Sequence, residues 1–334
     1  MSKVTWGILS TANIGVKRVI PAIIAGARGE VVAIASRDAA RAKKVAEQFA
    51  IDRSYGSYQA LLDDPGIEAI YNPLPNHLHV EWTVKALDAG KHVLCEKPIA
   101  LNALDAAAII AARDRSGRKV MEAFMVRFHP QWQRARALLR EGRIGVVRAI
   151  QSSFLFTVTD PDNVRNQADI GGGALYDVGC YPILTARYLL GTEPERAIAL
   201  VDRDPLSGVD RVTSGLLAFP GGCQLSFNSA LQLAPYQRVV IQGSDGRIEV
   251  PVPFTPQKEH GARLIIDSGK SLDGSSAIIE SFDPVDQYLL QCDGAARIFR
   301  GEAEQEFPIE DAIATMRAID ALYRSAVSGR WEVP

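Results

Sequence analysis

The sequence lacks the features that would direct it to a membrane, a secretion pathway or a nucleic acid. Its 334 residues contain no apolar run near the roughly 18 residues that span a bilayer, and the N-terminus has no long apolar stretch typical of a signal peptide. Lys and Arg total 37 against 39 Asp and Glu, so the net charge of -2 provides no general attraction to nucleic acids or anionic membranes. We therefore expect a cytoplasmic protein with neither kind of partner.

Cysteine is scarce, and the few cysteines are scattered. No C-x-x-C pair occurs among Cys95, Cys180, Cys223 and Cys292. In a chain of this length such residues are most simply reduced core residues. His77, His79 and His129 lack the clustered carboxylates or cysteines of a zinc site, so we expect no metal. The G-x-S-x-G signature of serine hydrolases is also absent.

The composition is that of a globular protein, with 47% hydrophobic and 23% charged residues, and the length suits about two domains. Within the first 125 residues, short apolar runs alternate with helical patterns. The runs occupy 4–9, 31–35, 68–71, 93–95 and 120–123, and the clearest helices 39–49, 79–89 and 103–114. This alternation predicts a doubly wound parallel sheet of the Rossmann type. Pro21, inside the helical pattern of residues 16–24, predicts an irregular turn there.

The pattern changes after about residue 145. Ile150, Phe154 and Phe156 share one parity with polar residues between them, which indicates a half-buried strand. Further strands are expected at 210–219, 223–230, 236–242, 247–252 and 262–267, and a last helix from about Pro308 to Gly329. We therefore expect an α/β protein with a dinucleotide-binding Rossmann domain, residues 1–123. A second α/β domain, residues 124–334, would contain a large open, mostly antiparallel sheet.

The turn after the first apolar run has the chemistry of a phosphate-binding loop. In the pattern G-x-G-x-x-G, its three glycine positions hold Ser10, Ala12 and Gly15. Small residues let the backbone approach a pyrophosphate at the N-terminus of the following helix. They also suit plain packing of a strand against a helix. The position of the turn, at the start of the βαβ pattern, favours a dinucleotide.

The end of the second run indicates which dinucleotide is preferred. NAD sites usually carry Asp or Glu there to bind the ribose 2′-OH, whereas this chain has Ser36 and Arg37. A hydroxyl and a planar cation suit a 2′-phosphate, so we expect NADP, with NAD as a possible substitute. The neighbouring Asp38 is a carboxylate and favours NAD instead. Arg37 is also consistent with an ordinary exposed arginine at a strand end.

Three side chains carry the chemistry expected of a dehydrogenase. Lys97 follows the run 93–95, at the edge of a parallel sheet where ligands bind. Asp177 and Tyr181 are four residues apart and would share one face of a helix. Alcohol oxidation needs a base, and a nearby ammonium lowers the pKa of a phenol from its usual value of about 10. Taken singly, Lys97 also fits a solvated strand end, and Tyr181 a core tyrosine.

Five segments occur in an order that resembles one known family. They are 6–14, 71–79, 96–98 (Glu-Lys-Pro), 127–130 (Arg-Phe-His-Pro) and 171–181, which begins Gly-Gly-Gly. Together they resemble the glucose-fructose oxidoreductase and inositol dehydrogenase (Gfo/Idh/MocA) family over essentially the whole chain. The set looks most like the branch with NADP-dependent D-xylose dehydrogenase and dimeric dihydrodiol dehydrogenase. The phosphate loop departs from the glycine-rich form of the family, which bears on cofactor affinity more than on fold.

The resemblance implies roles for particular residues. Lys97 matches the catalytic lysine of the family, Tyr181 its acid/base, and Asp177 a supporting carboxylate. The residues implied to contact the cofactor are Ser10, Thr11, Ala12, Asn13, Ile14, Ser36, Arg37, Pro73, Leu74, Asn76, His79, Glu96, Lys97 and Arg127. The resemblance also implies a homodimer or higher homo-oligomer, formed through the open sheet.

The main hypothesis is an NADP-dependent oxidoreductase that acts on a carbohydrate, such as an aldose or polyol, or on a cyclic trans-dihydrodiol. The main alternative is a non-catalytic, NADP-sensing regulator or binding protein of the same fold. A hydrolase or lyase that uses the nicotinamide transiently is a third reading. The presence of Lys97, Asp177 and Tyr181 favours the enzyme, because a sensor needs no acid/base pair.

Overall fold

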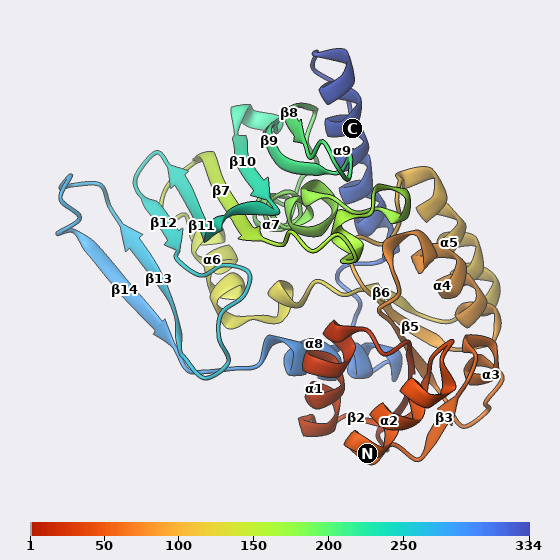
Figure 1. The fold of residues 1–334 in the computed structure, drawn as a ribbon. Helices are drawn as coiled ribbons and strands as arrows, with labels where there is room; N and C mark the ends of the chain where they lie inside the picture. The colour runs from red at the N-terminus through yellow and green to blue at the C-terminus, as the bar shows by residue number, and fades with distance from the viewer. Residues whose placement is uncertain (1) are drawn as a thin grey trace. The chain divides into compact units, whose positions relative to one another are not determined.

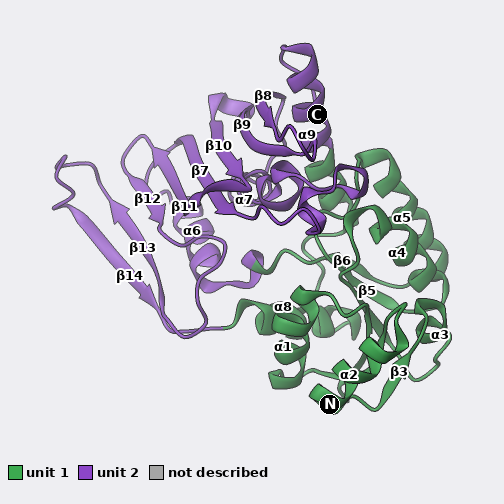
Figure 2. Cartoon of the chain, in the orientation of Figure 1, with its two compact units in different colours: residues 1–125, 286–316 green, residues 126–285, 317–334 purple. Residues whose placement is uncertain are grey.

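The computed structural model describes residues 2–334, which form two compact units (Figures 1 and 2). Unit 1 comprises the chain up to Met125 together with Asp286–Met316, and unit 2 comprises Val126–Val285 with Arg317–Pro334. The chain passes between the units after Met125, after Val285 and after Met316. Sequence periodicity did not predict that Asp286–Met316 belongs with the N-terminal half.

Unit 1 contains a six-stranded parallel sheet in the order β3-β2-β1-β4-β5-β6. The strands are β1 (Val4–Leu9), β2 (Gly29–Ala35), β3 (Arg53–Tyr55), β4 (Ala69–Asn72), β5 (His92–Cys95) and β6 (Val120–Glu122). All residues of β4 and β6 are buried, as expected for strands covered on both faces. The order reverses at β1, whose neighbours are β2 and β4, so the predicted doubly wound Rossmann sheet is confirmed.

The first five helices of unit 1 alternate with its strands, and a further one comes from the segment Asp286–Met316. They are α1 (Ile20–Ala25), α2 (Ala39–Phe49), α3 (Tyr58–Leu62), α4 (His79–Asp88), α5 (Ala103–Ser116) and α8 (Gln287–Phe299). A π-helical turn, η1 (Gly15–Val19), precedes α1, and Pro21 lies in the first turn of α1, where the missing N–H is tolerated. The irregular turn predicted from Pro21 is therefore confirmed. A short 3₁₀ turn, η2 (Asn76–Leu78), leads into α4.

The segment Asp286–Met316 completes unit 1 through side-chain contacts with its N-terminal part. The ring of Phe299, at the end of α8, lies 5.7 Å from that of Trp6 on β1 and stacks at 4.9 Å on that of His92 on β5. Asp293 accepts a hydrogen bond from the backbone N–H of Arg28 at 3.1 Å. A Cβ at Gly26 would lie 2.6 Å from the same carboxylate, so this position leaves no room for a side chain.

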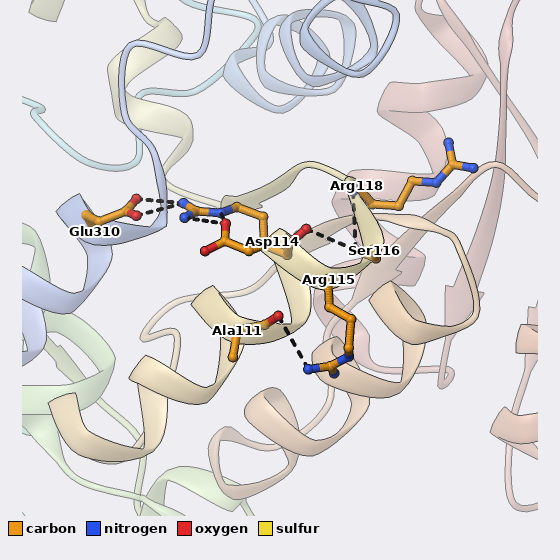
Figure 3. Close-up of polar contacts among 7 residues, drawn as sticks. Ala111, Asp114, Arg115, Ser116, Arg118 and Glu310 are labelled. Carbon is orange, nitrogen blue, oxygen red and sulfur yellow. Dashed lines mark hydrogen bonds and ion pairs between the residues drawn. The ribbon is translucent and has the colours of Figure 1, made fainter.

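The last helix, α9 (Ile309–Ser328), begins in unit 1 beside the C-terminal end of α5 (Figure 3). Arg113 donates two hydrogen bonds of 2.8 Å to the carboxylate of Glu310. At the end of α5, the Ser116 hydroxyl donates to the Arg113 carbonyl at 3.2 Å and accepts from the Arg118 N–H at 3.2 Å. The ion pair is partly exposed, so we expect it to contribute no more than about 1 kcal/mol.

Unit 2 is built on an eight-stranded sheet in the order β14-β13-β12-β11-β7-β10-β9-β8. Every neighbouring pair is antiparallel except β7 and β10. The strands are β7 (Val147–Thr157), β8 (Arg196–Arg203), β9 (Asp210–Ala218), β10 (Gln224–Ala230), β11 (Gln232–Gly243), β12 (Arg247–Val250), β13 (Ala262–Asp267) and β14 (Ala277–Phe282). The large, mostly antiparallel sheet is therefore confirmed, and Ile150 and Phe154 on β7 are buried as their parity predicts.

Helices α6 (Pro130–Arg140) and α7 (Cys180–Leu190) belong to unit 2, and a π-helical turn, η6 (Leu175–Gly179), leads into α7. Short 3₁₀ turns occur at η3 (Met125–Phe128), η4 (Val164–Asn166), η5 (Ala168–Ile170) and η7 (Pro220–Gly222). The sequence patterns did not predict β3, β8, β14, α3, α6 or α8, most of which are short or lack strong periodicity.

Within residues 2–334, no helix is both long enough and apolar enough to traverse a bilayer. The same residues contain no group of three or more His, Cys, Asp or Glu side chains that could hold a metal ion.

A neutral histidine begins α6. His129 Nδ1 accepts a hydrogen bond from the backbone N–H of Gln131 at 3.1 Å, and the side chain is 2% exposed. Burial lowers the pKa of His129 to about 4. Protonation of Nδ1 would remove the acceptor that caps the helix.

We expect the substitution His129→Asn to reduce the acid sensitivity of the fold. With a folded-state pKa of about 4 and an unfolded value of about 6.5, His129 contributes stability above pH 6.5 that is lost as the pH falls toward 4. The loss between pH 7 and pH 4.5 is about 2 kcal/mol, and Asn retains a capping acceptor that does not titrate. Urea unfolding of both proteins at the two pH values measures the difference. Equal losses in the two proteins would contradict this assignment.

Candidate active site

The turn after β1 has the backbone that a phosphate-binding loop requires. Ser10 has a φ of 72°, in the left-handed region where the fingerprint carries its first glycine. Its hydroxyl accepts a hydrogen bond from the N–H of Ala12 at 3.2 Å, which stabilises the tight turn locally. Thr11 and Ala12 are half-buried and Asn13 is exposed, just before the π-helical turn that begins at Gly15. Small side chains and a helix start thus meet here, as an anion site needs.

At the end of β2, the neighbouring carboxylate is committed to another role. Asp38 caps α2 and accepts from the backbone N–H groups of Ala40 and Arg41 at 3.0 and 3.2 Å. The buried Ser36 accepts from the N–H of Asp38 at 3.2 Å. Arg37 is exposed and interacts with the Tyr58 hydroxyl, although burial is the larger influence and raises the pKa of Tyr58. The Asp38 carboxylate therefore has a structural role as the N-cap of α2.

The loop after β4 is held by buried polar side chains. Asn72, fully buried, accepts from the N–H of Leu74 at 3.3 Å and donates to the carbonyl of His79 and the hydroxyl of Thr83, both at 3.2 Å. Pro73 and Leu74 are buried, and Asn76 is half-buried. A Cβ on Gly15 would lie 3.8 Å from the Pro73 ring, so this loop packs beside the helix start that follows the phosphate turn.

The ring of His79 connects two loops rather than facing solvent. Nε2 lies 2.6 Å from the Leu74 carbonyl oxygen, Nδ1 lies 2.7 Å from the Pro98 carbonyl oxygen, and the side chain is 1% exposed. Burial lowers the pKa of His79 to about 4, and the two carbonyls act in the opposite direction. His79 therefore lies between the backbone of the loop after β4 and that of the segment after β5.

The segment after β5 carries the Glu-Lys-Pro sequence. Glu96 accepts a hydrogen bond of 2.6 Å from the Tyr71 hydroxyl on β4, and burial followed by this carboxylate raises the pKa of Tyr71. Burial and the Glu96 charge also raise the pKa of Tyr288 on α8. Lys97 is half-buried, and its peptide bond to Pro98 is cis. Unit 1 thus brings together the phosphate turn, the loop after β4 and the Glu-Lys-Pro segment.

In unit 2, each glycine of residues 171–173 has its own physical reason. Gly171 has a φ of 84° at the end of η5. A Cβ on Gly172 would lie 2.6 Å from the carbonyl oxygen of Arg165. Gly173 has a φ of 120°, and a Cβ there would lie 2.0 Å from the carboxylate of Asp210. Only glycine satisfies these conditions without a shift of the backbone.

Asp210, the first residue of β9, explains the third of these glycines. Its buried carboxylate accepts from the N–H of Leu175 and the hydroxyl of Thr213, both at 2.7 Å, and from the Tyr323 hydroxyl of α9 at 3.1 Å. Burial raises the pKa of Asp210. The carboxylate therefore anchors the N-terminal end of η6, the turn that contains Asp177 and leads to Tyr181. Sequence patterning treated Asp210 only as the start of a strand.

Asp177 and Tyr181 have different surroundings. Arg165 Nε donates to Asp177 at 2.6 Å, in a pair that is partly exposed on the arginine side. Tyr181 is 5% exposed, and its ring lies 5.4 Å from that of Phe154 and 5.3 Å from that of Phe254. Asp177 lies within the π-helical turn η6 and Tyr181 in the first turn of α7, so the uniform α-helix assumed from sequence does not describe this segment.

Other polar residues of unit 2 are engaged in local structure. Arg127 is the second residue of unit 2 and is 9% exposed. Asn163, considered from sequence as a candidate pocket residue, accepts from the N–H of Arg165 at 3.1 Å. Gln232, considered for the same reason, donates to Asp204 at 2.6 Å.

The fold and these groups define an oxidoreductase with a dinucleotide-binding Rossmann domain. The sequence profile of the "Oxidoreductase family, NAD-binding Rossmann fold" (GFO_IDH_MocA) matches residues 4–124, and that of the "GFO/IDH/MocA C-terminal domain" matches residues 132–249. The chain therefore belongs to the Gfo/Idh/MocA family of oxidoreductases, and the resemblance inferred from its motifs is confirmed.

Similar proteins cover nearly the whole chain. An uncharacterized oxidoreductase ORF334 of Rhizobium meliloti is 46% identical over 99% of both chains. D-xylose 1-dehydrogenase (NADP(+)) 2 of Haloferax volcanii is 40% identical over 97% of this chain and 98% of its own. The crystal structure of KijD10, a 3-ketoreductase from Actinomadura kijaniata in complex with NADP and TDP-benzene, superposes with a TM-score of 0.90 at 31% identity, covering 97% of this chain and 98% of that one.

We expect Gly173→Ala to destabilise the fold by about 3 kcal/mol or more. The new Cβ would overlap the Asp210 carboxylate and would also occupy a positive φ, and both effects are unfavourable. Gly15→Ala is the matched control, because its Cβ would meet the Tyr71 ring at an ordinary 3.5 Å. Thermal unfolding of the two variants measures the contrast. Similar melting temperatures for both would show that Asp210 does not restrict this position.

Proposed function

We propose that this chain is an NADP-dependent oxidoreductase that acts on a CH–OH group of a carbohydrate, such as an aldose or polyol, or of a related cyclic diol. What supports the proposal is that unit 1 carries an ammonium directly after β5 and unit 2 carries a phenol in the first turn of α7, in a chain that is similar to an NADP-dependent D-xylose dehydrogenase. Residues 1–123 would bind the cofactor, and residues 124–334 would bind the substrate.

Each of these residues has a chemical task in the proposal. NADP, when bound, supplies a hydride acceptor at the nicotinamide ring. Tyr181 takes the proton of the substrate hydroxyl in oxidation and returns it in reduction. The ammonium of Lys97 favours the phenolate form of that tyrosine and orients the substrate oxygen. Asp177, which accepts a hydrogen bond from Arg165 Nε at 2.6 Å, would hold the polar network of the site.

The residues present fit NADP on two counts. Ser10 provides the left-handed backbone of a phosphate loop with small neighbours. Arg37 is an exposed cation at the end of β2, and Asp38 beside it is engaged by α2. We assign the remaining cofactor contacts to Thr11, Ala12, Asn13, Ile14, Ser36, Pro73, Leu74, Asn76, Glu96, Lys97 and Arg127, with His79 acting through Leu74 and Pro98.

Lys97→Met and Tyr181→Phe test the catalytic roles. Each variant should lower kcat by about 10²- to 10⁴-fold, because each removes a group that handles the proton, and NADPH binding measured by fluorescence should remain. Turnover is followed at 340 nm with a panel of aldoses, polyols and cyclic diols. Wild-type turnover in both variants would refute the roles. Failure of every substrate, with NADPH still bound, would favour a cofactor-sensing protein.

Cofactor preference is tested by kcat/KM with NADP and NAD. We expect NADP to be preferred by at least about 10-fold, since one charge-assisted contact with the 2′-phosphate is worth about 1.5–3 kcal/mol. Arg37→Ala should lose most of this preference by weakening NADP alone. Lys43→Ala removes an equally positive, exposed charge from α2 and serves as the control. Equal values for the two cofactors in the unaltered protein would contradict the proposal.

We further propose a homodimer, or a higher homo-oligomer, formed through the sheet of unit 2. Leu200 on β8 and Leu216 on β9 lie on the same face of that sheet and are 80% and 44% exposed. Apolar side chains grouped in this way favour contact with a partner surface. Light scattering should give at least twice the 36.3 kDa of one chain, and a single-chain mass would exclude the assembly.

A further inference from the structure

The two residues that follow Lys97 are each held by a buried side chain from a different element. The Pro98 carbonyl oxygen lies 2.7 Å from Nδ1 of His79 on α4. The N–H of Ile99 donates to Oε1 of Glu122 on β6 at 2.9 Å. His79 and Glu122 are 1% and 5% exposed, so neither presents its side chain to a substrate.

Both holding side chains are themselves firmly placed. The backbone carbonyl of His79 accepts from Asn72, and its second ring nitrogen faces the Leu74 carbonyl at 2.6 Å. Glu122 pairs with Cys95 in the register of β5 and β6, and the N–H of Ala123 donates to the Cys95 carbonyl at 2.8 Å. The contacts to Pro98 and Ile99 therefore fix the segment beside Lys97 relative to α4 and to the parallel sheet.

We propose that His79 and Glu122 are positioning residues that clamp Pro98–Ile99 and thereby set the direction of the Lys97 side chain. The inference rests on the role proposed above for Lys97. A side chain with four rotatable bonds places its ammonium reproducibly only if its own backbone is fixed, and displacement of a catalytic group by about 1 Å can cost 10²-fold in rate. If the segment lost its contact with His79 or with Glu122, it would still carry Lys97, but the Lys97 side chain would no longer be held in one direction.

Paired variants of Glu122 separate the clamp from the bulk of the side chain. Glu122→Gln retains an acceptor oxygen for the Ile99 N–H, whereas Glu122→Met has a similar size and no such acceptor. Glu310→Gln, in an exposed ion pair of α9, is the matched control for the loss of one carboxylate. His79→Phe retains a buried ring but removes the tie to Pro98, and it provides the second test if Glu122→Met does not fold.

Two readouts report on Lys97. The first is competitive acetylation of Lys97 relative to the exposed Lys43, quantified by mass spectrometry, which needs no substrate. The second is the division between kcat and KM. We expect Glu122→Met to change the relative acetylation of Lys97 by about 3-fold or more and to lower kcat by about 10- to 100-fold, with KM and the NADPH Kd nearly unchanged. Glu122→Gln and Glu310→Gln should stay within about 2-fold of the original protein.

The outcomes distinguish this inference from the proposed function. A folded Glu122→Met protein with unchanged acetylation and kcat would overturn the clamp, as would equal losses in Glu122→Gln and Glu122→Met. If Lys97→Met keeps full turnover, the catalytic proposal fails, while the acetylation experiment still decides whether Glu122 and His79 orient Lys97. His79→Phe should reproduce the change in acetylation, because the clamp uses the single N–H of the neutral imidazole, on Nδ1, to hold the Pro98 carbonyl. An unchanged acetylation pattern in that variant counts against the clamp.

Discussion

Polar groups at the carboxyl edge of the parallel sheet are buried, and the geometry of unit 1 depends on satisfying them. A buried carbonyl or N–H without a hydrogen-bond partner lowers the free energy of unfolding by about 1–3 kcal/mol. The loops after β4 and β5 are therefore restricted to conformations that satisfy these groups. Asn72, fully buried, bonds to the loop, to the start of α4 and to Thr83. His79 then links that loop to the segment after β5. These hydrogen bonds fix the backbone conformation at the carboxyl edge of the sheet, which is where doubly wound sheets bind their ligands.

In unit 2, one buried carboxylate, that of Asp210, satisfies polar groups from three elements. Asp210 gathers an N–H from the beginning of η6, a hydroxyl from its own strand and a hydroxyl from α9. Three donors offset the desolvation of the buried carboxyl group, whose pKa burial nevertheless raises. The close approach of this carboxylate requires a glycine at position 173. The Gly-Gly-Gly segment is therefore a closely packed junction that leads to Tyr181.

The role of Asp38, which follows β2, depends on the contacts that its carboxylate makes in the fold. Read from sequence, Asp38 is a carboxylate beside the expected 2′-phosphate and would repel it. In the fold it accepts two backbone N–H groups at the start of α2, where a negative charge is favoured by the helix dipole. Arg37 remains as the exposed charge at this strand end.

Periodicity along the chain was enough to predict the two classes of sheet, most strands, and the position of the turn after the first strand. The physical reason is that burial of a strand on one or two faces imposes a period on neighbouring residues. It also located Lys97 directly after a strand and Pro21 at an irregular turn. Tertiary structure alone decided the return of α8 to the first unit, the role of Asp210, and the π-helical turn that contains Asp177 and leads to Tyr181. These features depend on contacts between residues far apart in the chain, such as Asp293 with Arg28 or Tyr323 with Asp210, and such contacts leave no period in the sequence.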